Sequence, residues 1–113
     1  MLVTKEFTFD SAHFLPDYHG KCEDMHGHTY KMHVTIQGEV QPDGMVFDFV
    51  ELKKIVNEKV IKHLDHKLLN EVIATPSAEN IAIWTWEKLE KDLPLYEIKV
   101  WETPTSFVTY RKS

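Results

Sequence analysis

Hydrophobic and polar residues alternate most regularly over residues 29–38. Because successive side chains of an extended chain point to opposite faces, this period of two predicts a half-buried β-strand. Stretches rich in β-branched and aromatic residues predict further strands over residues 3–9, 96–102 and 107–111. A Pro-Asp-Gly turn signal follows the alternating segment, so a short strand over residues 45–47 is expected to complete a hairpin with it.

Two further segments repeat their apolar residues at the spacing of a helix. The first covers residues 52–64, and Asp48 with a glutamate three positions later forms a variant capping box before it. The second covers residues 78–93, where Ser77 is the expected N-cap and Pro94 ends the helix. The order strand, long loop, hairpin, helix, helix, hairpin favours an α+β fold with the helices on one face of an antiparallel sheet.

The composition is that of one ordinary domain over residues 1–113, with 42% hydrophobic residues, 27% charged residues and a formal charge of −5. A single cysteine excludes an internal disulfide, which fits a reducing compartment. No apolar run approaches the roughly 20 residues that cross a bilayer, and the first residues lack the layout of a signal peptide. We therefore expect a cytoplasmic protein without a membrane partner. No basic cluster stands out, so nucleic-acid binding is not expected.

The candidate chemistry is concentrated in the histidines. His26 and His28 lie two residues apart, and an extended chain points both side chains to one face, the face of Tyr30. Together with His13 from another segment they make a set of three imidazoles, which holds Zn²⁺ in catalytic sites and leaves a fourth position open. His33 falls on the opposite face and is expected to be a solvated strand residue.

Three further positions have both a chemical and a plain structural interpretation. Cys22 lies in a polar loop and is a small buried hydrophobe, a fourth metal ligand that closes the site, or a thiolate base. Asp65 and His66 form either an acid–base pair or the polar end of a helix. Glu102 lies in phase with apolar residues of its strand, so its carboxylate needs a partner, such as a ligand with two adjacent N–H groups.

Four motifs occur in order along the chain. They are Cys-Glu-Asp-Met-His-Gly-His at residues 22–28, Leu-Asp-His-Lys-Leu-Leu-Asn at 64–70, Thr-Pro-Ser-Ala-Glu-Asn at 75–80 and Trp-Glu-Thr-Pro-Thr-Ser at 101–106. Together they resemble the 6-pyruvoyl-tetrahydropterin synthase / 6-carboxytetrahydropterin synthase family of lyases, over nearly the whole chain. The resemblance implies the tunnelling fold, a four-stranded antiparallel sheet with two helices on one face. It also implies trimerisation into a barrel, and a homohexamer of two such rings with active sites at subunit interfaces.

The resemblance assigns a role to each residue of interest. The expected zinc ligands are His13, His26 and His28. The expected catalytic residues are Cys22, Asp65 and His66. The expected substrate contacts are Glu102, Thr103 and Thr105, of which Glu102 anchors the pterin by a paired hydrogen bond. The implied mechanism is metal-assisted general acid–base catalysis.

The family substrate is 7,8-dihydroneopterin triphosphate, and the product differs by subfamily. The three-residue gap between Cys22 and His26 favours 6-carboxy-5,6,7,8-tetrahydropterin, formed with release of acetaldehyde and triphosphate and used for queuosine or archaeosine. The alternatives are 6-pyruvoyl-tetrahydropterin, the precursor of biopterin, and 6-hydroxymethyl-7,8-dihydropterin, for which Glu23 would be catalytic. A non-catalytic zinc- or pterin-binding module is the alternative of another class, and the intact thiol and dyad argue against it.

Overall fold

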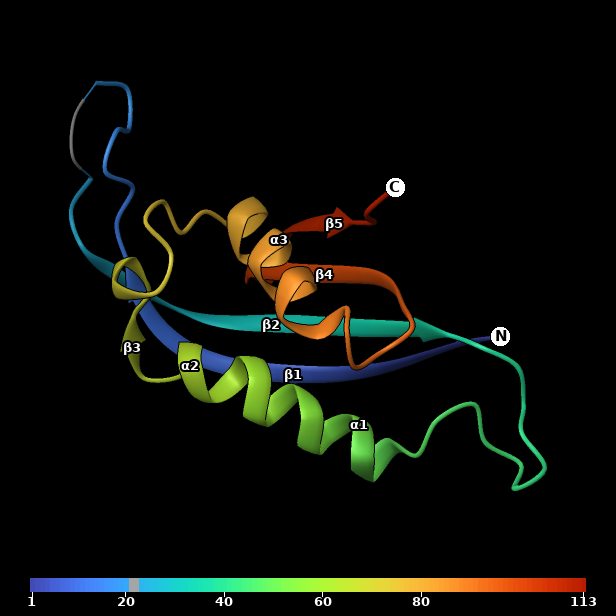
Figure 1. Cartoon of the computed structure of the whole chain (residues 1–113). Helices are drawn as coiled ribbons and strands as arrows, with labels where there is room; N and C mark the ends of the chain where they lie inside the picture. The colour runs from blue at the N-terminus through green and yellow to red at the C-terminus, as the bar shows by residue number, and fades with distance from the viewer. Residues whose placement is uncertain (21–22) are drawn as a thin grey trace.

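The structure, a computed structural model, describes residues 1–20 and 23–113. Its centre is a five-stranded sheet with the strand order β3-β1-β2-β4-β5 (Figure 1). The strands are β1 Leu2–His13, β2 His26–Gln37, β3 Lys67–Leu68, β4 Leu95–Thr103 and β5 Ser106–Tyr110. All neighbouring strands are antiparallel except β3, which pairs in parallel with β1.

The strand β3 corrects the expectation of a four-stranded, fully antiparallel sheet. Lys67 and Leu68 pair with Ser11 and Ala12 beyond the edge that β1 would otherwise expose. A two-residue strand is too short to show a period in the sequence, which is why the hydrophobic pattern did not reveal it.

The expected strand over residues 45–47 is wrong. This segment belongs to an irregular loop, in which the backbone N–H of Gln41 donates to the carbonyl oxygen of Met45 at 2.9 Å. Both edges of β2 are already paired, one with β1 and the other with β4. A hairpin partner for β2 therefore has no free edge at which to bind.

The strands β1 and β2 are longer at the loop end than the sequence predicts. They pair without interruption from Leu2 opposite Gln37 to His13 opposite His26. Residues 11–13, which were expected to be irregular, are therefore part of β1, and residues 26–28 are part of β2. This continuation carries all three candidate histidines into the sheet.

The first helical segment runs as α1 Phe49–Val56, the π-helical η1 Asn57–Ile61 and α2 Lys62–Leu64. It begins as predicted, because the carboxylate of Asp48 accepts a hydrogen bond from the backbone N–H of Val50 at 2.9 Å. The π-helical turn was not predicted from the sequence, which favours one regular helix.

A 3₁₀ turn, η2 Leu69–Glu71, then leads toward α3 Ala78–Leu89. The N-cap of α3 is Ser77, as predicted, with its hydroxyl accepting from the N–H of Asn80 at 3.1 Å. The helix ends four residues before the predicted Leu93, which closes the following turn by donating to Leu89.

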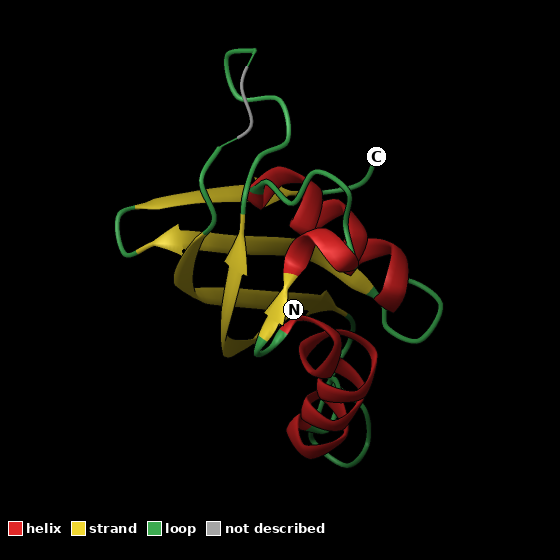
Figure 2. Cartoon of the chain, turned by 90° about the vertical axis from the view of Figure 1, so that its left-hand side faces the viewer, coloured by secondary structure: helices red, strands yellow, loops and turns green. Residues whose placement is uncertain are grey.

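The helices cover one face of the sheet, and the core lies between the two layers (Figure 2). The sheet contributes fully buried residues from alternate positions of β2 and β4, namely Tyr30, Met32, Val34, Ile36, Ile98 and Val100. The other face is more exposed and carries an aromatic and charged cluster, in which His33 contacts Glu6 and Trp101. Among the described residues, no helix is both long and apolar enough to cross a membrane.

Candidate metal centre and active site

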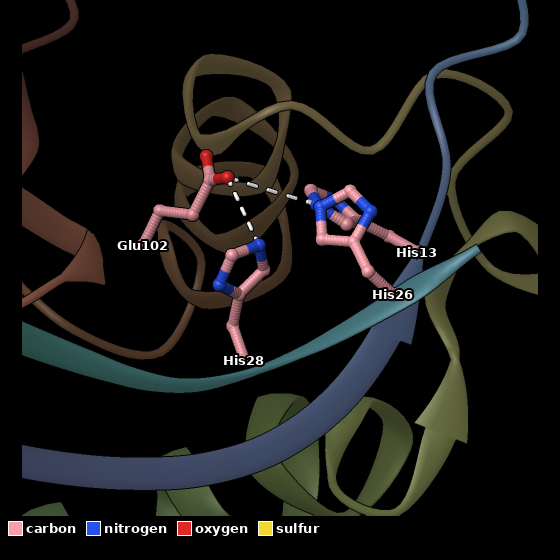
Figure 3. Close-up of side chains that lie close together, drawn as sticks. All are labelled: His13, His26, His28 and Glu102. Atoms are coloured by element: carbon pink, nitrogen blue, oxygen red, sulfur yellow. Dashed lines mark hydrogen bonds and ion pairs between the residues drawn. The ribbon is translucent and has the colours of Figure 1, made fainter. Parts of the chain in front are cut away.

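Three histidine side chains from the paired ends of β1 and β2 converge on one point (Figure 3). The strand register places His13 directly opposite His26, and His28 follows on the same face of β2. The Nε2 atoms of His13 and His26 are 3.1 Å apart. The ring of His28 lies 5.1 Å from that of His13 and 4.7 Å from that of His26. Strand pairing therefore brings the three predicted metal ligands together.

Backbone carbonyl groups orient two of these rings. The Nδ1 atom of His13 lies 2.9 Å from the carbonyl oxygen of Pro76, and Nδ1 of His26 lies 3.0 Å from that of Asp24. A carbonyl oxygen only accepts hydrogen bonds, so each Nδ1 carries a hydrogen, and the neutral form of each ring presents its lone pair at Nε2. Proteins commonly orient imidazole ligands toward a metal ion in this way.

Glu102 adds a carboxylate to the three imidazoles. Its Oε1 atom is 3.1 Å from Nε2 of His28 and 3.7 Å from Nε2 of His13 (Figure 3). One ligand atom from each of the four residues lies within 4.8 Å of every other. Ligands held at about 2.0–2.1 Å by a tetrahedral zinc ion are roughly 3.3 Å apart. The separations of 3.1 Å and 3.7 Å within the group are close to this value.

The chemistry of this group also fits a cation. The buried Nε2 atom of His28 makes no hydrogen bond within the described residues, although the Glu102 carboxylate lies close to it. Burial lowers the pKa of His28, and the negative charge of Glu102 opposes this effect without cancelling it. A neutral imidazole with an unused lone pair, next to a carboxylate, is the form that binds a metal ion.

Tyr30 supports the histidines from within the core. Its hydroxyl oxygen is 3.1 Å from Nδ1 of His13, and its ring stacks on Phe9 with the ring centroids 5.0 Å apart. Burial raises the pKa of Tyr30, so the side chain remains a neutral phenol. Its contact with His13 was missed from the sequence, where the only signal was that Tyr30 lies in phase with His28.

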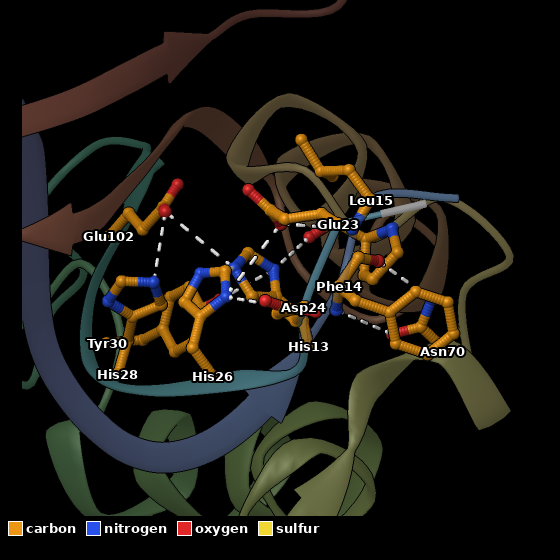
Figure 4. Close-up of polar contacts among 11 residues, drawn as sticks. His13, Phe14, Leu15, Glu23, Asp24, His26, His28, Tyr30, Asn70 and Glu102 are labelled. Carbon is orange, nitrogen blue, oxygen red and sulfur yellow. Dashed lines mark hydrogen bonds and ion pairs between the residues drawn. The ribbon is translucent and has the colours of Figure 1, made fainter. Parts of the chain in front are cut away.

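The chain that leaves β1 is held by the side chain of Asn70 (Figure 4). Its Oδ1 accepts from the N–H of Phe14 at 3.1 Å, and its Nδ2 donates to the carbonyl oxygen of the same residue at 2.9 Å. Asn70 belongs to the motif at residues 64–70. Through these two hydrogen bonds the motif holds the backbone of Phe14, the residue next to His13.

Glu23 bridges the long loop and the metal group. Its Oε1 atom accepts from the N–H of Leu15 at 3.1 Å and lies 3.8 Å from Nδ1 of His26 (Figure 4). The predicted catalytic thiol, Cys22, lies outside the described residues. Glu23 follows Cys22 in the sequence, and its carboxylate lies beside the candidate metal ligand His26.

A cavity of about 480 Å³ opens beside Glu102. Its walls include His28, Glu102, Thr103 and Trp101, so it adjoins the metal group at the predicted pterin anchor. Thr105, the other predicted substrate contact, lies in the exposed turn between β4 and β5. The cavity has the aromatic wall and the few polar groups that are common in small-molecule sites.

Asp65 and His66 form a close pair directly after α2. Nδ1 of His66 is 3.0 Å from Oδ1 of Asp65, which also accepts from the backbone N–H of Asp10 at 3.0 Å. The Asp10 N–H, and then His66, lower the pKa of Asp65 against the opposing effect of burial. Asp65 therefore remains an ionised hydrogen-bond acceptor that orients the imidazole, as an acid–base dyad requires.

The dyad and the metal group of the same chain are separate clusters that adjoin one cavity. His66 lines this cavity, of about 640 Å³, together with His28, Asp10, Ala12 and Thr29. The last three of these residues alternate along β1 and β2 with the histidine positions, so their side chains point to the other face of the sheet. Within the described residues the two candidate groups remain separate.

Proteins with similar sequences and structures form a class of enzymes named for pterin chemistry. The chain is 36% identical to the 6-carboxy-5,6,7,8-tetrahydropterin synthase of Haemophilus influenzae, covering 97% of this chain and 98% of that protein. It is 40% identical to the dihydroneopterin monophosphate aldolase of Pyrococcus furiosus, covering 84% and 83%. The structure of the Caenorhabditis elegans 6-pyruvoyl tetrahydropterin synthase matches with a TM-score of 0.88 and 31% identity, covering 100% and 96%.

The family described as 6-pyruvoyl tetrahydropterin synthase matches residues 2–113, and the chain belongs to this family. It is accordingly an enzyme of the lyase class, a pterin synthase that acts on a pterin substrate. The family assignment confirms the resemblance expected from the four motifs.

The geometry predicts that His28 is required for metal binding and that His33 is not. His28→Ala removes one of three converging imidazoles, whereas His33 lies on the opposite face of the same strand, paired with Glu6. Titration of metal-free protein with Zn²⁺ against a chromophoric chelator is expected to show an affinity at least tenfold weaker for His28→Ala. Wild-type affinity in His28→Ala, or an equal loss in His33→Ala, would contradict this assignment.

Proposed function

We propose that the chain is a zinc-dependent synthase that converts 7,8-dihydroneopterin triphosphate to 6-carboxy-5,6,7,8-tetrahydropterin, with release of acetaldehyde and triphosphate. The observation that carries the proposal is the convergence of His13, His26 and His28 beside a cavity that Glu102 lines. Three neutral imidazoles are the ligand set of catalytic zinc, which leaves a position for water or substrate.

The proposed zinc ligands are the Nε2 atoms of His13, His26 and His28. When bound there, zinc supplies Lewis-acid polarisation of the substrate's side-chain hydroxyl groups, which acidifies the adjacent C–H bonds. Nitrogen ligands and a borderline-soft ion suit each other, and the carbonyl contacts to Nδ1 of His13 and His26 keep the coordinating lone pairs directed inward.

Glu102 is proposed to anchor the pterin. A carboxylate has two oxygens that accept a pair of parallel hydrogen bonds from the 2-amino group and N3–H of the ring. Oε1 of Glu102 also lies within reach of the candidate metal ligands, so the same residue has the position of a fourth ligand. The two roles have opposite consequences for metal affinity, which makes them separable by experiment.

Proton transfer is assigned to Cys22 and to His66, with Asp65 orienting His66. The ionised carboxylate of Asp65 holds Nδ1–H of His66, which leaves Nε2 free to take or give a proton. Because the dyad and the metal ligands form separate clusters within one chain, we propose that the dyad serves the metal site of a neighbouring subunit. Closure of three sheets into a barrel, and of two barrels into a hexamer, would also pair the sheet edges at β3 and β5.

The 6-carboxy product is placed first because of the short spacing between Cys22 and His26 and the similarity to the Haemophilus influenzae enzyme over nearly the whole chain. The second candidate is formation of 6-hydroxymethyl-7,8-dihydropterin. It is supported by the position of the Glu23 carboxylate, 3.8 Å from His26, and by the similarity to a protein named as an aldolase. Formation of 6-pyruvoyl-tetrahydropterin is the third.

The product is identified directly by incubating the zinc-loaded protein with 7,8-dihydroneopterin triphosphate and analysing the reaction by mass spectrometry. The expected result is 6-carboxy-5,6,7,8-tetrahydropterin together with acetaldehyde. Cys22→Ala is expected to keep its zinc and to lose about 10²–10⁴-fold in rate, as removal of an acid–base group does. A purely 6-pyruvoyl or 6-hydroxymethyl product would replace the first candidate, and absence of any turnover would favour a binding module.

Glu102→Gln separates the two roles of the carboxylate. The amide keeps the shape of the side chain but loses the charge and one acceptor oxygen, so we expect pterin affinity to fall by about 1.5–3 kcal/mol, the worth of a charged hydrogen bond. Zinc affinity is expected to stay within a factor of about three. Fluorescence titration with a pterin and competitive zinc titration measure the two quantities. Weakened zinc binding with unchanged pterin binding would show that Glu102 is a metal ligand instead.

Mixed oligomers test whether the site is shared between subunits. His28→Ala and His66→Ala are each expected to be inactive, because one lacks a metal ligand and the other lacks the dyad imidazole. Co-expressed with different tags and purified through both, they are expected to recover activity at interfaces that combine the intact parts.

The control for this experiment is the pair His26→Ala and His28→Ala, which damages the same metal group in every chain and is expected to remain inactive when mixed. Doubly tagged oligomers of His28→Ala and His66→Ala that show no activity above the control would refute the shared site.

A further inference from the structure

Asp10 connects the Asp65–His66 dyad to the sheet through bonds at both ends of the pair. Its backbone N–H donates to Oδ1 of Asp65 at 3.0 Å, and its carbonyl oxygen accepts from the backbone N–H of His66 at 2.6 Å. A carboxylate oxygen of Asp10 also lies within 4.8 Å of the nearest ligand atoms of both dyad residues. One residue of β1 thus contacts the orienting carboxylate and the backbone that carries the imidazole.

The backbone of His66 needs such support. Its φ is 55°, in the left-handed region that a non-glycine residue adopts only at some cost in free energy. The hydrogen bond from its N–H to Asp10 begins the parallel pairing of the next two residues, Lys67 and Leu68, with β1. The dyad therefore depends on β1 for its conformation, and β1 is the strand that ends at His13.

Thr29 holds the side chain of Asp10. The two residues are direct partners in the β1–β2 register, and the hydroxyl of Thr29 donates to Oδ1 of Asp10 at 2.5 Å. Both lie on the face opposite the histidines and line the cavity that includes His66. The bond fixes the Asp10 carboxylate on the side of the dyad, and it comes from the residue next to His28 in β2.

We propose that Asp10, held by Thr29, is a positioning residue for proton transfer, which fixes the imidazole of His66 in its working orientation. Asp10 does not line the cavity beside Glu102, whereas Thr29 does. Asp10 acts through Asp65 and His66, so its loss should slow turnover without weakening substrate binding. This inference rests on the proposed acid–base function of the dyad.

Three variants isolate this role. Asp10→Ala removes the carboxylate and leaves the backbone bonds to the dyad in place. Thr29→Val removes only the hydroxyl and keeps a β-branched residue that suits the strand. Thr29→Ser restores a hydroxyl. The matched control is Glu6→Gln, which neutralises a carboxylate on the same strand and face that pairs instead with His33.

The experiment combines steady-state kinetics of the zinc-loaded enzyme with ¹⁵N spectra of its labelled histidines, with the His66 signals assigned from His66→Gln. Asp10→Ala and Thr29→Val are expected to lower kcat by about tenfold or more and to shift the ¹⁵N signals of the His66 ring, with KM within about twofold for Asp10→Ala. Thr29→Ser is expected to recover most of both effects, and Glu6→Gln to match the wild type.

Unchanged His66 signals in both variants, or kcat within twofold of wild type, would overturn the proposal. So would an equal effect of Glu6→Gln, because a general charge effect would then explain the loss. Failure of the proposed function would give a different result: full turnover by His66→Gln would show that the dyad takes no part in the reaction. The ¹⁵N spectra do not depend on turnover, so they test the positioning by Asp10 and Thr29 in either case.

Discussion

The register of β1 against β2 is the constraint on which the rest of the site depends. Twelve consecutive residues of each strand pair without a bulge, and the last pair is His13 with His26. A shift of the register by one residue would send the side chains of one strand to the opposite face relative to the other. The buried partners Phe9 and Tyr30, which stack in the same pairing, resist such a shift because it would expose their aromatic surface.

The same alternation divides the chemistry of the chain between two faces. On the helix-covered face, carbonyl contacts direct the imidazoles of His13 and His26 toward one point, and burial lowers the pKa of His28. On the other face, Asp65 and His66 remain accessible beside an open cavity, with 79% of the His66 side chain exposed. In the proposed mechanism these two groups are complementary parts of one reaction site that forms between chains, which would give a physical reason for assembly.

The strongest local patterns of the sequence predicted the parts of the fold that are governed by local physics. Alternation around Tyr30 and the side-chain caps at Asp48 and Ser77 are confirmed, because each depends on residues close in the chain. The extra strand β3 and the loop at residues 45–47 were predicted incorrectly, because strand pairing depends on which edges distant segments have already occupied.

The candidate site shows the same division. The spacing of His26 and His28 was sufficient to predict that they share a face, and His13 was grouped with them as a third imidazole from another segment. Glu102 was singled out because it lies in phase with the apolar residues of its strand. The contacts of Asp10 with Asp65 and of Tyr30 with His13 join residues far apart in sequence, and no local pattern marks them. The separation of the dyad from the metal group also became visible only when the faces of the folded sheet were known.

X-ray absorption spectroscopy at the zinc edge of the zinc-loaded protein tests the central claim most directly. The account predicts one zinc per chain with three imidazole nitrogens at about 2.0–2.1 Å, one further oxygen or nitrogen neighbour and no sulfur. A sulfur neighbour at about 2.3 Å would make Cys22 a ligand and close the site. A spectrum without imidazole scattering, or protein that binds no zinc, would contradict the account of the three histidines altogether.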